Sequence, residues 1–155
     1  MSDLNGKTIA IISTNGFEDS ELTSPKEAVE SAGAATKIVS TETGEIEGKK
    51  GAKVSVDETT ADASVDEFDA LILPGGTTNA DTIRTDKDAV ALVKAFKDAG
   101  KPIGVICHGG WILADADLLK GVKLTSVANV KTDLANAGAN WVDEEVVVDS
   151  GFISS

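Results

Sequence analysis

The 155-residue sequence has only one cysteine and one histidine, and no tyrosine. A single cysteine cannot form a disulfide within the chain, which fits a reducing compartment. A metal site built from several Cys and His ligands is impossible within one chain for the same reason. A papain-like triad needs a histidine far from the cysteine in sequence, whereas here His108 directly follows Cys107. We therefore expect no metal and no cofactor, and any Cys–His mechanism within one subunit must use this pair.

Positive charge is also scarce: 14 basic residues stand against 26 acidic ones, for a net charge of −12. Such a surface repels phosphate backbones and anionic membranes, so we expect neither nucleic acid nor membrane as a partner. The polar N-terminal segment 1–7 has no basic stretch followed by an apolar run, which argues against a signal peptide. The longest apolar runs, near 9–12 and 70–73, are too short to span a bilayer. A cytoplasmic location is the expectation.

Aromatic residues make up only 4% of the chain, but 41% of it is hydrophobic, enough for one domain spanning residues 1–155. Short apolar runs of strand length alternate with helical patterns. Strands are predicted at 8–12, 37–39, 70–73, 103–106, 123–125 and 145–148, a surface hairpin within 42–57, and helices from about 25 to 32, from 86 to 99, around 112–119 and at 131–137. This alternation predicts an α/β fold with a mostly parallel sheet and helices on both faces.

Ligands of such sheets bind at the carboxyl ends of the strands. Three turns, at 15–21, 74–81 and 107–111, follow predicted strands and should meet there. The first turn should lead into a helix that begins near Ser24-Pro25, which has the pattern of a capping box with proline at the first helical position.

Cys107 lies where a predicted strand should turn sharply into a helix. The apolar run Ile103–Ile106 delivers the thiol to the end of the strand, and Gly109-Gly110 allows an immediate turn, as in the nucleophile elbow of hydrolases. The positive end of the following helix should lower the pKa of the thiol and make it reactive. The alternative is a buried structural cysteine with a chance histidine neighbour.

Candidate partners for this thiol come from the other two turns. Backbone N–H groups at Gly75 and Gly76, with Gly109 and the amide of His108 on the elbow, could bind a developing oxyanion. The alternative is that the glycines serve only the geometry of tight turns. One of the acidic residues Glu18, Asp19 and Glu21 could point to the sulfur and be held protonated by desolvation and by the thiolate. The alternative for them is a solvated acidic turn at a helix N-terminus.

Four segments resemble the PfpI family, within the superfamily of the Parkinson-disease deglycase. They are Gly16-Phe17-Glu18-Asp19-Ser20-Glu21-Leu22, Leu73-Pro74-Gly75-Gly76, Ile106-Cys107-His108-Gly109 and the stretch 136–149. The resemblance implies a flavodoxin-like fold around a nucleophilic cysteine, as in class I glutamine amidotransferases. It implies that Glu21 lies beside the sulfur, that Glu18 lines the pocket, and that His108 pairs with an acid of a neighbouring subunit, for which Asp81 occupies the matching position.

The sequence departs from the family pattern in two places. Gly110 stands where the family usually has proline, which should loosen the elbow, and the family's C-terminal covering helix is not found within the 155 residues. The second departure bears on sheet coverage and oligomerisation. If the family pattern holds, the chain assembles as a homo-oligomer, a dimer or a hexamer, with Asp81 completing the site across an interface.

The resemblance implies a cysteine hydrolase or lyase acting on small reactive carbonyls such as methylglyoxal, or on their protein adducts, in a stress response. The second enzymatic interpretation is an intracellular peptidase that uses Cys107, His108 and Asp81 on a peptide substrate. A non-catalytic stress protein, a redox sensor or chaperone with an oxidisable Cys107, remains open. A nucleotide binder is disfavoured because Thr14-Asn15-Gly16 lacks the glycine spacing of a phosphate loop.

Overall fold

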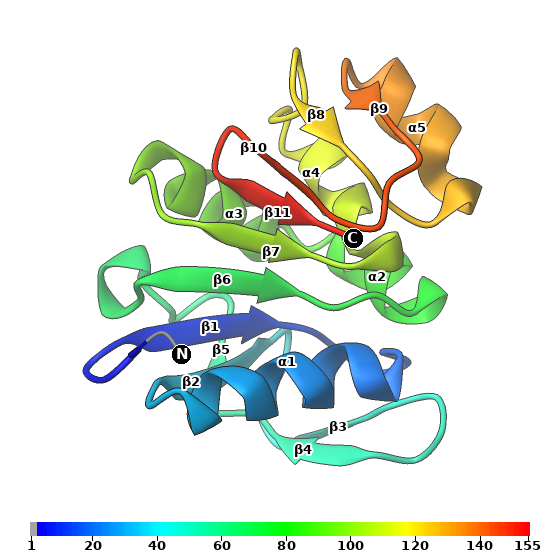
Figure 1. Cartoon of the computed structure of the whole chain (residues 1–155). Helices are drawn as coiled ribbons and strands as arrows, with labels where there is room; N and C mark the ends of the chain where they lie inside the picture. Colours follow the sequence, from blue (N-terminus) through cyan, green and yellow to red (C-terminus); the bar gives the residue numbers. More distant parts are fainter. Residues whose placement is uncertain (1–2) are drawn as a thin grey trace.

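The computed structural model describes residues 3–155 and contains a central sheet of seven strands (Figure 1). In spatial order the strands are β10 (Val147–Asp149), β11 (Phe152–Ser154), β7 (Ile103–Val105), β6 (Ala70–Leu73), β1 (Thr8–Ile12), β2 (Ala35–Ser40) and β5 (Glu58–Thr59). Every pairing in this sheet is parallel except that of β10 with β11. The prediction of a mostly parallel α/β sheet is confirmed.

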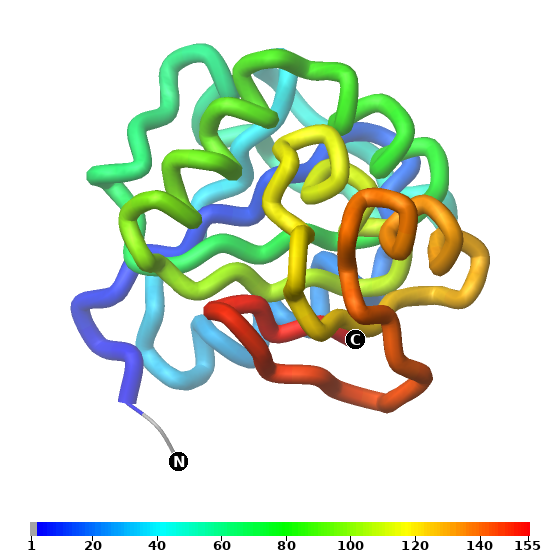
Figure 2. The backbone as a smooth tube through the Cα atoms, turned by 90° about the horizontal axis from the view of Figure 1, so that it is seen from above, coloured from blue at the N-terminus to red at the C-terminus, as the bar shows by residue number. Residues whose placement is uncertain are grey.

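Helices cover both faces of the sheet. The α-helices of the described residues are α1 (Asp19–Ser31), α2 (Thr77–Ile83), α3 (Lys87–Asp98), α4 (Trp111–Asp115) and α5 (Lys131–Asn136). Helix α1 lies on one face, and α2, α3 and α4 lie on the other (Figures 1 and 2). Alternate residues of β1 pack against the helices on opposite faces of the sheet. Ile12 packs with the cluster that includes residues of α3, whereas Ile11 packs with Phe17 and Leu22. The continuous apolar run of β1 is therefore buried on both sides.

Helix α1 begins at Asp19, so the prediction of a helix start at Ser24-Pro25 is wrong. Pro25 lies inside the helix and cannot donate the backbone hydrogen bond that an interior residue normally makes to the carbonyl four residues earlier, here that of Glu21. Tertiary packing outweighs this loss, because Leu22, in the first turn of the helix, is fully buried against the sheet. The early start places Glu21 in the first turn of the helix, at the carboxyl end of β1.

Two further elements differ from the prediction. The helix after the elbow ends at Asp115 rather than near residue 119, and Asp117 adopts a left-handed conformation with φ of 56°. The C-terminal strand is a hairpin of β10 and β11, joined at Ser150 and Gly151, which both have positive φ. Positive φ at both central residues is characteristic of a type I′ turn, whose twist suits a two-residue hairpin.

The face of the sheet that carries α1 is covered unevenly. Ile11, Ile72, Gly104 and Ile153 are in register across β1, β6, β7 and β11 and so point to this face. Ile11 is fully buried, whereas the side chain of Ile153 is 47% exposed. Coverage by α1 therefore weakens toward the edge of the sheet formed by β10 and β11.

A second, smaller hairpin, β3 (Glu45–Glu47) and β4 (Lys53–Ser55), lies over the loop between β1 and α1. The amide of Gly16 donates to the carbonyl of Glu47 over 2.9 Å, and the amide of Lys49 donates to the carbonyl of Phe17 over 3.0 Å. The carboxylate of Asp19 accepts the amides of Lys50 and Ala52 at the hairpin tip. These bonds fix the tip beside Glu18, at the end of the loop, and beside the first turn of α1, which carries Glu21. A third pair, β8 (Lys123–Leu124) with β9 (Asn140–Trp141), lies beyond α4.

Within residues 3–155, no helix has the length and apolar character needed to cross a bilayer.

Candidate active site

Cys107 lies in a strained turn directly after β7. Its φ is 58°, a left-handed conformation that is uncommon for a residue with a side chain. The chain continues into a 3₁₀ turn, Cys107–Gly110, and then into α4. Gly109 is required here, because a Cβ at this position would lie 2.4 Å from the carbonyl oxygen of Leu73. At Gly110 the nearest atom to such a Cβ lies 3.5 Å away, so an alanine would fit there without overlap.

Glu21 reaches this thiol from the first turn of α1. Its Oε1 accepts the backbone N–H of Gly75 over 2.9 Å, and its carboxyl group lies close enough to the Cys107 side chain for its negative charge to raise the pKa of the thiol. Burial raises the pKa of the Glu21 carboxyl above its ordinary value. A Cβ on Gly75 would lie 2.3 Å from Oε1 of Glu21 and 3.0 Å from Cβ of Cys107, so only glycine permits this approach. The three turns that sequence reasoning expected to meet do meet here.

The pKa of the Cys107 thiol is raised to about 11, so the expectation of a depressed pKa is wrong. Burial is the main cause, and the negative charge of Glu21 adds to it; the backbone N–H of His108 acts in the opposite direction but is outweighed. The helix beyond the elbow has only five residues, which limits the field that its N-terminus can supply. At neutral pH the sulfur therefore keeps its proton and has a carboxyl group beside it to take that proton.

His108 lies between the sulfur and an exposed threonine. Its Nδ1 is 3.6 Å from Sγ of Cys107, and its Nε2 is 3.4 Å from Oγ1 of Thr77. The ring also meets Trp111 edge-on, with 5.6 Å between centroids. Burial and the nearby ammonium of Lys49 lower the pKa of the imidazole below 6.5, so His108 is neutral at pH 7. A neutral ring has one free nitrogen lone pair and can act as a base.

Because His108 is the only histidine in the chain, its titration can be followed without assignment work. We expect its NMR midpoint to lie below 6.5, since burial and the charge of Lys49 both disfavour the imidazolium. Lys49→Met should move the midpoint upward, whereas Lys7→Met, which removes an equal charge outside the site, should leave it unchanged. A wild-type midpoint at or above 6.5 would contradict the placement of the ring.

Glu18 lies at the entrance of the site, but its carboxylate is paired with lysines of the hairpin tip. Its carboxylate oxygens lie 2.6 Å from Nζ of Lys49 and 3.0 Å from Nζ of Lys50, and its side chain is 17% exposed. Hydrogen bonds from Lys49 and then Lys50 lower the pKa of Glu18. Glu18 is therefore ionised and is a weaker base than Glu21. These two lysines bring positive charge to the site of an otherwise acidic protein.

The glycine turn after β6 was expected to offer the backbone N–H groups of Gly75 and Gly76 to an oxyanion, but one of them is already used. The N–H of Gly75 is taken by the carboxyl group of Glu21. Gly76 has φ of 91°, and a Cβ there would lie 2.4 Å from the carbonyl oxygen of Gly16.

Asp81, the expected partner of His108, is exposed on α2, and within one subunit the other ring nitrogen of His108 faces Thr77 instead.

Sequence reasoning missed three residues of the site. Thr77 and Asn79 lie in the segment 74–81 that was expected to form the site, but nothing in their type distinguishes them from residues of an ordinary helix start. Lys49 lies in the hairpin, 58 positions before Cys107 in the chain. Only the docking of the hairpin tip on the loop after β1 could have revealed it, and that docking depends on backbone hydrogen bonds that no sequence pattern encodes.

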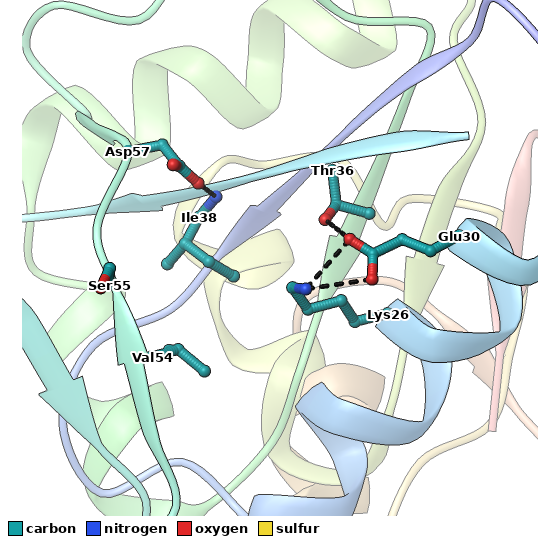
Figure 3. A pocket seen from close by; sticks show the side chains of 7 residues that line it. All are labelled: Lys26, Glu30, Thr36, Ile38, Val54, Ser55 and Asp57. Atoms are coloured by element: carbon teal, nitrogen blue, oxygen red, sulfur yellow. Dashed lines mark hydrogen bonds and ion pairs between the residues drawn. The ribbon is translucent and has the colours of Figure 1, made fainter. Parts of the chain in front are cut away.

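A hollow of about 380 Å³ lies elsewhere, between α1, β2 and β4 (Figure 3). Its lining residues are Lys26, Glu30, Thr36, Ile38, Val54, Ser55 and Asp57. The charged groups already have partners: Lys26 and Thr36 donate to Glu30, and Asp57 accepts the amide of Ile38. These lining residues include no thiol, no histidine and no unpaired charge, so this hollow is a weaker candidate for an active site than the turn at Cys107.

Among residues 3–155, no group of three or more His, Cys, Asp and Glu side chains could hold a metal ion.

A parallel α/β sheet with helices on both faces, and a cysteine on a strained turn after a central strand, define a flavodoxin-like protein with a nucleophile elbow. The model of the DJ-1/PfpI family matches residues 7–155, and the chain belongs to that family. A solved two-domain protein from Anabaena variabilis, with DJ-1/ThiJ/PfpI-like and ferritin-like domains, superposes with a TM-score of 0.94 at 33% identity. The match covers 96% of this chain and 43% of that one.

Two curated relatives cover most of the chain. A Thermococcus kodakarensis protein named as a deglycase is 44% identical over 147 residues, which are 95% of this chain and 88% of that protein. A Bacillus subtilis protein named as a candidate cysteine protease is 43% identical over 150 residues, 96% of this chain and 88% of that protein. Family and relatives together support hydrolase or lyase activity for this chain as a class.

Proposed function

We propose that this protein is a Cys107-dependent lyase or hydrolase of small reactive carbonyls, a glutathione-independent glyoxalase or a protein deglycase. The observation that carries the proposal is the pairing of Cys107 with Glu21 at the elbow, where burial raises the pKa of both groups. A thiol that keeps its proton until a carboxylate removes it is suited to addition to an aldehyde. The 44% identity to the relative named as a deglycase supports the same class of substrate.

The first step is addition of the thiol to an aldehyde carbon. As the Cys107 sulfur forms the carbon–sulfur bond, its proton passes to the Glu21 carboxylate, and Glu21 then gives a proton to the former carbonyl oxygen. The product is a hemithioacetal, and both protein groups end the step with their charges balanced. The N–H of Gly75 holds Oε1 of Glu21 at 2.9 Å and so fixes the acid beside the sulfur. A free N–H at Gly76 is the remaining candidate donor to the developing oxyanion.

With methylglyoxal, the next step moves a proton from the first carbon to the neighbouring carbonyl carbon through an enediol. Neutral His108, with Nδ1 3.6 Å from the sulfur, is the candidate base, since Glu18 is neutralised by two lysines. The resulting thioester of lactate is then hydrolysed by water, which returns the thiol. One methylglyoxal and one water thus give one lactate with no external oxidant or reductant.

The test is lactate formation from methylglyoxal without glutathione. Wild-type protein should form lactate with turnover, and Cys107→Ala should fall to the rate of buffer alone, because the nucleophile is lost. Matched unfolding midpoints of the two proteins show that the fold is intact. Loss of methylglyoxal without lactate, in stoichiometric amount only, would indicate a scavenging or sensing thiol and would overturn the proposal.

A peptidase is the second candidate, favoured by the relative named as a candidate cysteine protease and by His108 beside the sulfur. This activity requires an acid to orient His108, and we propose Asp81 of a neighbouring subunit in a homo-oligomer. Asp81 is exposed on α2 and is free to meet a second copy. Cleavage of a fluorogenic peptide amide that disappears both in Asp81→Asn and on dilution to monomer would favour this candidate over the glyoxalase.

A further inference from the structure

Asn79, in the first turn of α2, is a fully buried polar residue whose whole side chain is engaged by the backbone of two turns of the site. Its Oδ1 accepts the N–H of Thr14 over 2.7 Å, at the end of β1. Its Nδ2 donates to the carbonyl of Pro74 over 3.2 Å and to that of Gly75 over 3.0 Å. One carboxamide thus joins the turn after β1 to the turn after β6, and none of its polar atoms touches the sulfur or a catalytic side chain.

The two carbonyls that Asn79 holds determine where the next two amides point. In a planar trans peptide the C=O and the following N–H point in opposite directions, and the described chain has no cis peptide. With the carbonyl of Pro74 turned toward Asn79, the N–H of Gly75 points away, and there it donates to Oε1 of Glu21. With the carbonyl of Gly75 also turned toward Asn79, the N–H of Gly76 is directed away in the same manner.

Only an amide side chain meets all three requirements. The site needs one acceptor for Thr14 and two donor hydrogens for the carbonyls of Pro74 and Gly75, which asparagine has. An aspartate of the same size would keep the acceptor but face two carbonyl oxygens with a carboxylate. Leucine would fill the volume but leave the N–H of Thr14 and the carbonyl of Pro74 without a partner, and the carbonyl of Gly75 would keep only the N–H of Glu18, at 3.3 Å.

We propose that Asn79 is a positioning residue that acts through the Pro74-Gly75-Gly76 turn. By fixing the two peptide planes it makes the N–H of Gly75 hold Glu21 against Cys107 and keeps the N–H of Gly76 available to an oxyanion. The inference rests on the proposed function for its turnover readout, whereas its thiol readout is independent of any substrate.

The experiment compares Asn79→Asp and Asn79→Leu with wild type. Turnover of methylglyoxal should lose roughly 10- to 100-fold in kcat with a much smaller change in KM, because binding groups remain while the reacting groups shift by a fraction of an ångström to an ångström. In Asn79→Leu, the pH at half-maximal iodoacetamide labelling of Cys107 should move below the wild-type value near 11, since Glu21 is no longer held beside the sulfur.

The matched control is Thr60→Val, which removes a part-buried hydrogen bond from Oγ1 of the buried Thr60 to Asp86, away from the site. It should lower the urea midpoint as the Asn79 variants do, with kcat and the labelling curve unchanged. Asn79 variants whose kcat stays within about threefold of wild type, with an unmoved labelling curve, would overturn the inference. If wild type shows no turnover, the proposed function fails, and the labelling curve alone decides the role of Asn79.

Discussion

Glu21→Gln is expected to lower methylglyoxal turnover by roughly 10²- to 10⁴-fold while making the Cys107 thiol more reactive toward iodoacetamide at neutral pH. The two effects have opposite signs because Glu21 acts on the sulfur in two ways. As a base and acid it moves the proton that the addition requires, and glutamine cannot do this. As a negative charge it raises the pKa of the thiol, and glutamine removes that charge.

The change in thiol reactivity follows from the direction in which Glu21 shifts the pKa of Cys107. Burial and the Glu21 charge raise the thiol pKa to about 11, so at pH 7 the thiolate fraction is very small. Without the carboxylate the pKa falls toward the value that burial alone sets, and the thiolate fraction at pH 7 grows. The measurement is the rate of iodoacetamide labelling from pH 6 to 11 in both proteins. Loss of turnover together with slower labelling would indicate a disrupted site rather than a lost proton carrier.

Stability provides the check that the fold is intact. The pKa of Glu21 is raised in the folded state, so its ionisation opposes folding: the stability it contributes is fully present below pH 4.5 and is lost as the pH rises through the folded value. Glutamine, which cannot ionise, should leave the unfolding midpoint at pH 7 unchanged or raised. Glu27→Gln, on the exposed side of the same helix, is the matched control and should alter neither turnover nor labelling.

The strands could be predicted because a strand buried on both faces is a continuous run of apolar residues. Ile11 and Ile12 of β1 face opposite layers yet both are apolar and buried, which is the pattern of a strand buried on both sides. Helix α3 was predictable for a similar reason, since Asp86 caps it and its buried residues repeat with helical spacing. Asp86 accepts the amide of Asp88, as its position before the apolar pattern suggested.

The start of α1 and the state of the thiol were not predictable from local patterns. Pro25 signals a helix start, but the burial of Leu22 against the sheet outweighs that signal, and burial is a property of the whole fold. Likewise, the position of Cys107 before a helix predicts a depressed pKa, whereas the actual pKa depends on how closely Glu21 approaches across 86 positions of the chain. Candidate residues could thus be named from sequence, but their charges and contacts could not.

Gly76→Ala is expected to destabilise the fold strongly, because it adds both backbone strain and a steric overlap at one position. Gly76 has φ of 91°, which costs a residue with a side chain about 1–3 kcal/mol. The added Cβ would lie 2.4 Å from the carbonyl oxygen of Gly16 and 2.5 Å from the amide nitrogen of Glu18, and both are backbone atoms that cannot rotate away. Overpacking of this kind costs about 1–3 kcal/mol more.

The expected sum is roughly 2–6 kcal/mol in the free energy of unfolding, or about 4–24 °C in Tm for a chain of this size. Urea unfolding at pH 7 measures it. Gly121→Ala is the matched control, because Gly121 also has positive φ, 77°, but has no atom within 4 Å of an added Cβ. It should lose only the conformational part, about 1–2 kcal/mol. The difference between the two variants isolates the contact of the turn after β6 with the loop after β1, the contact that brings Gly75 to Glu21. Equal losses in the two variants would mean that these turns are not packed against each other as the structure places them.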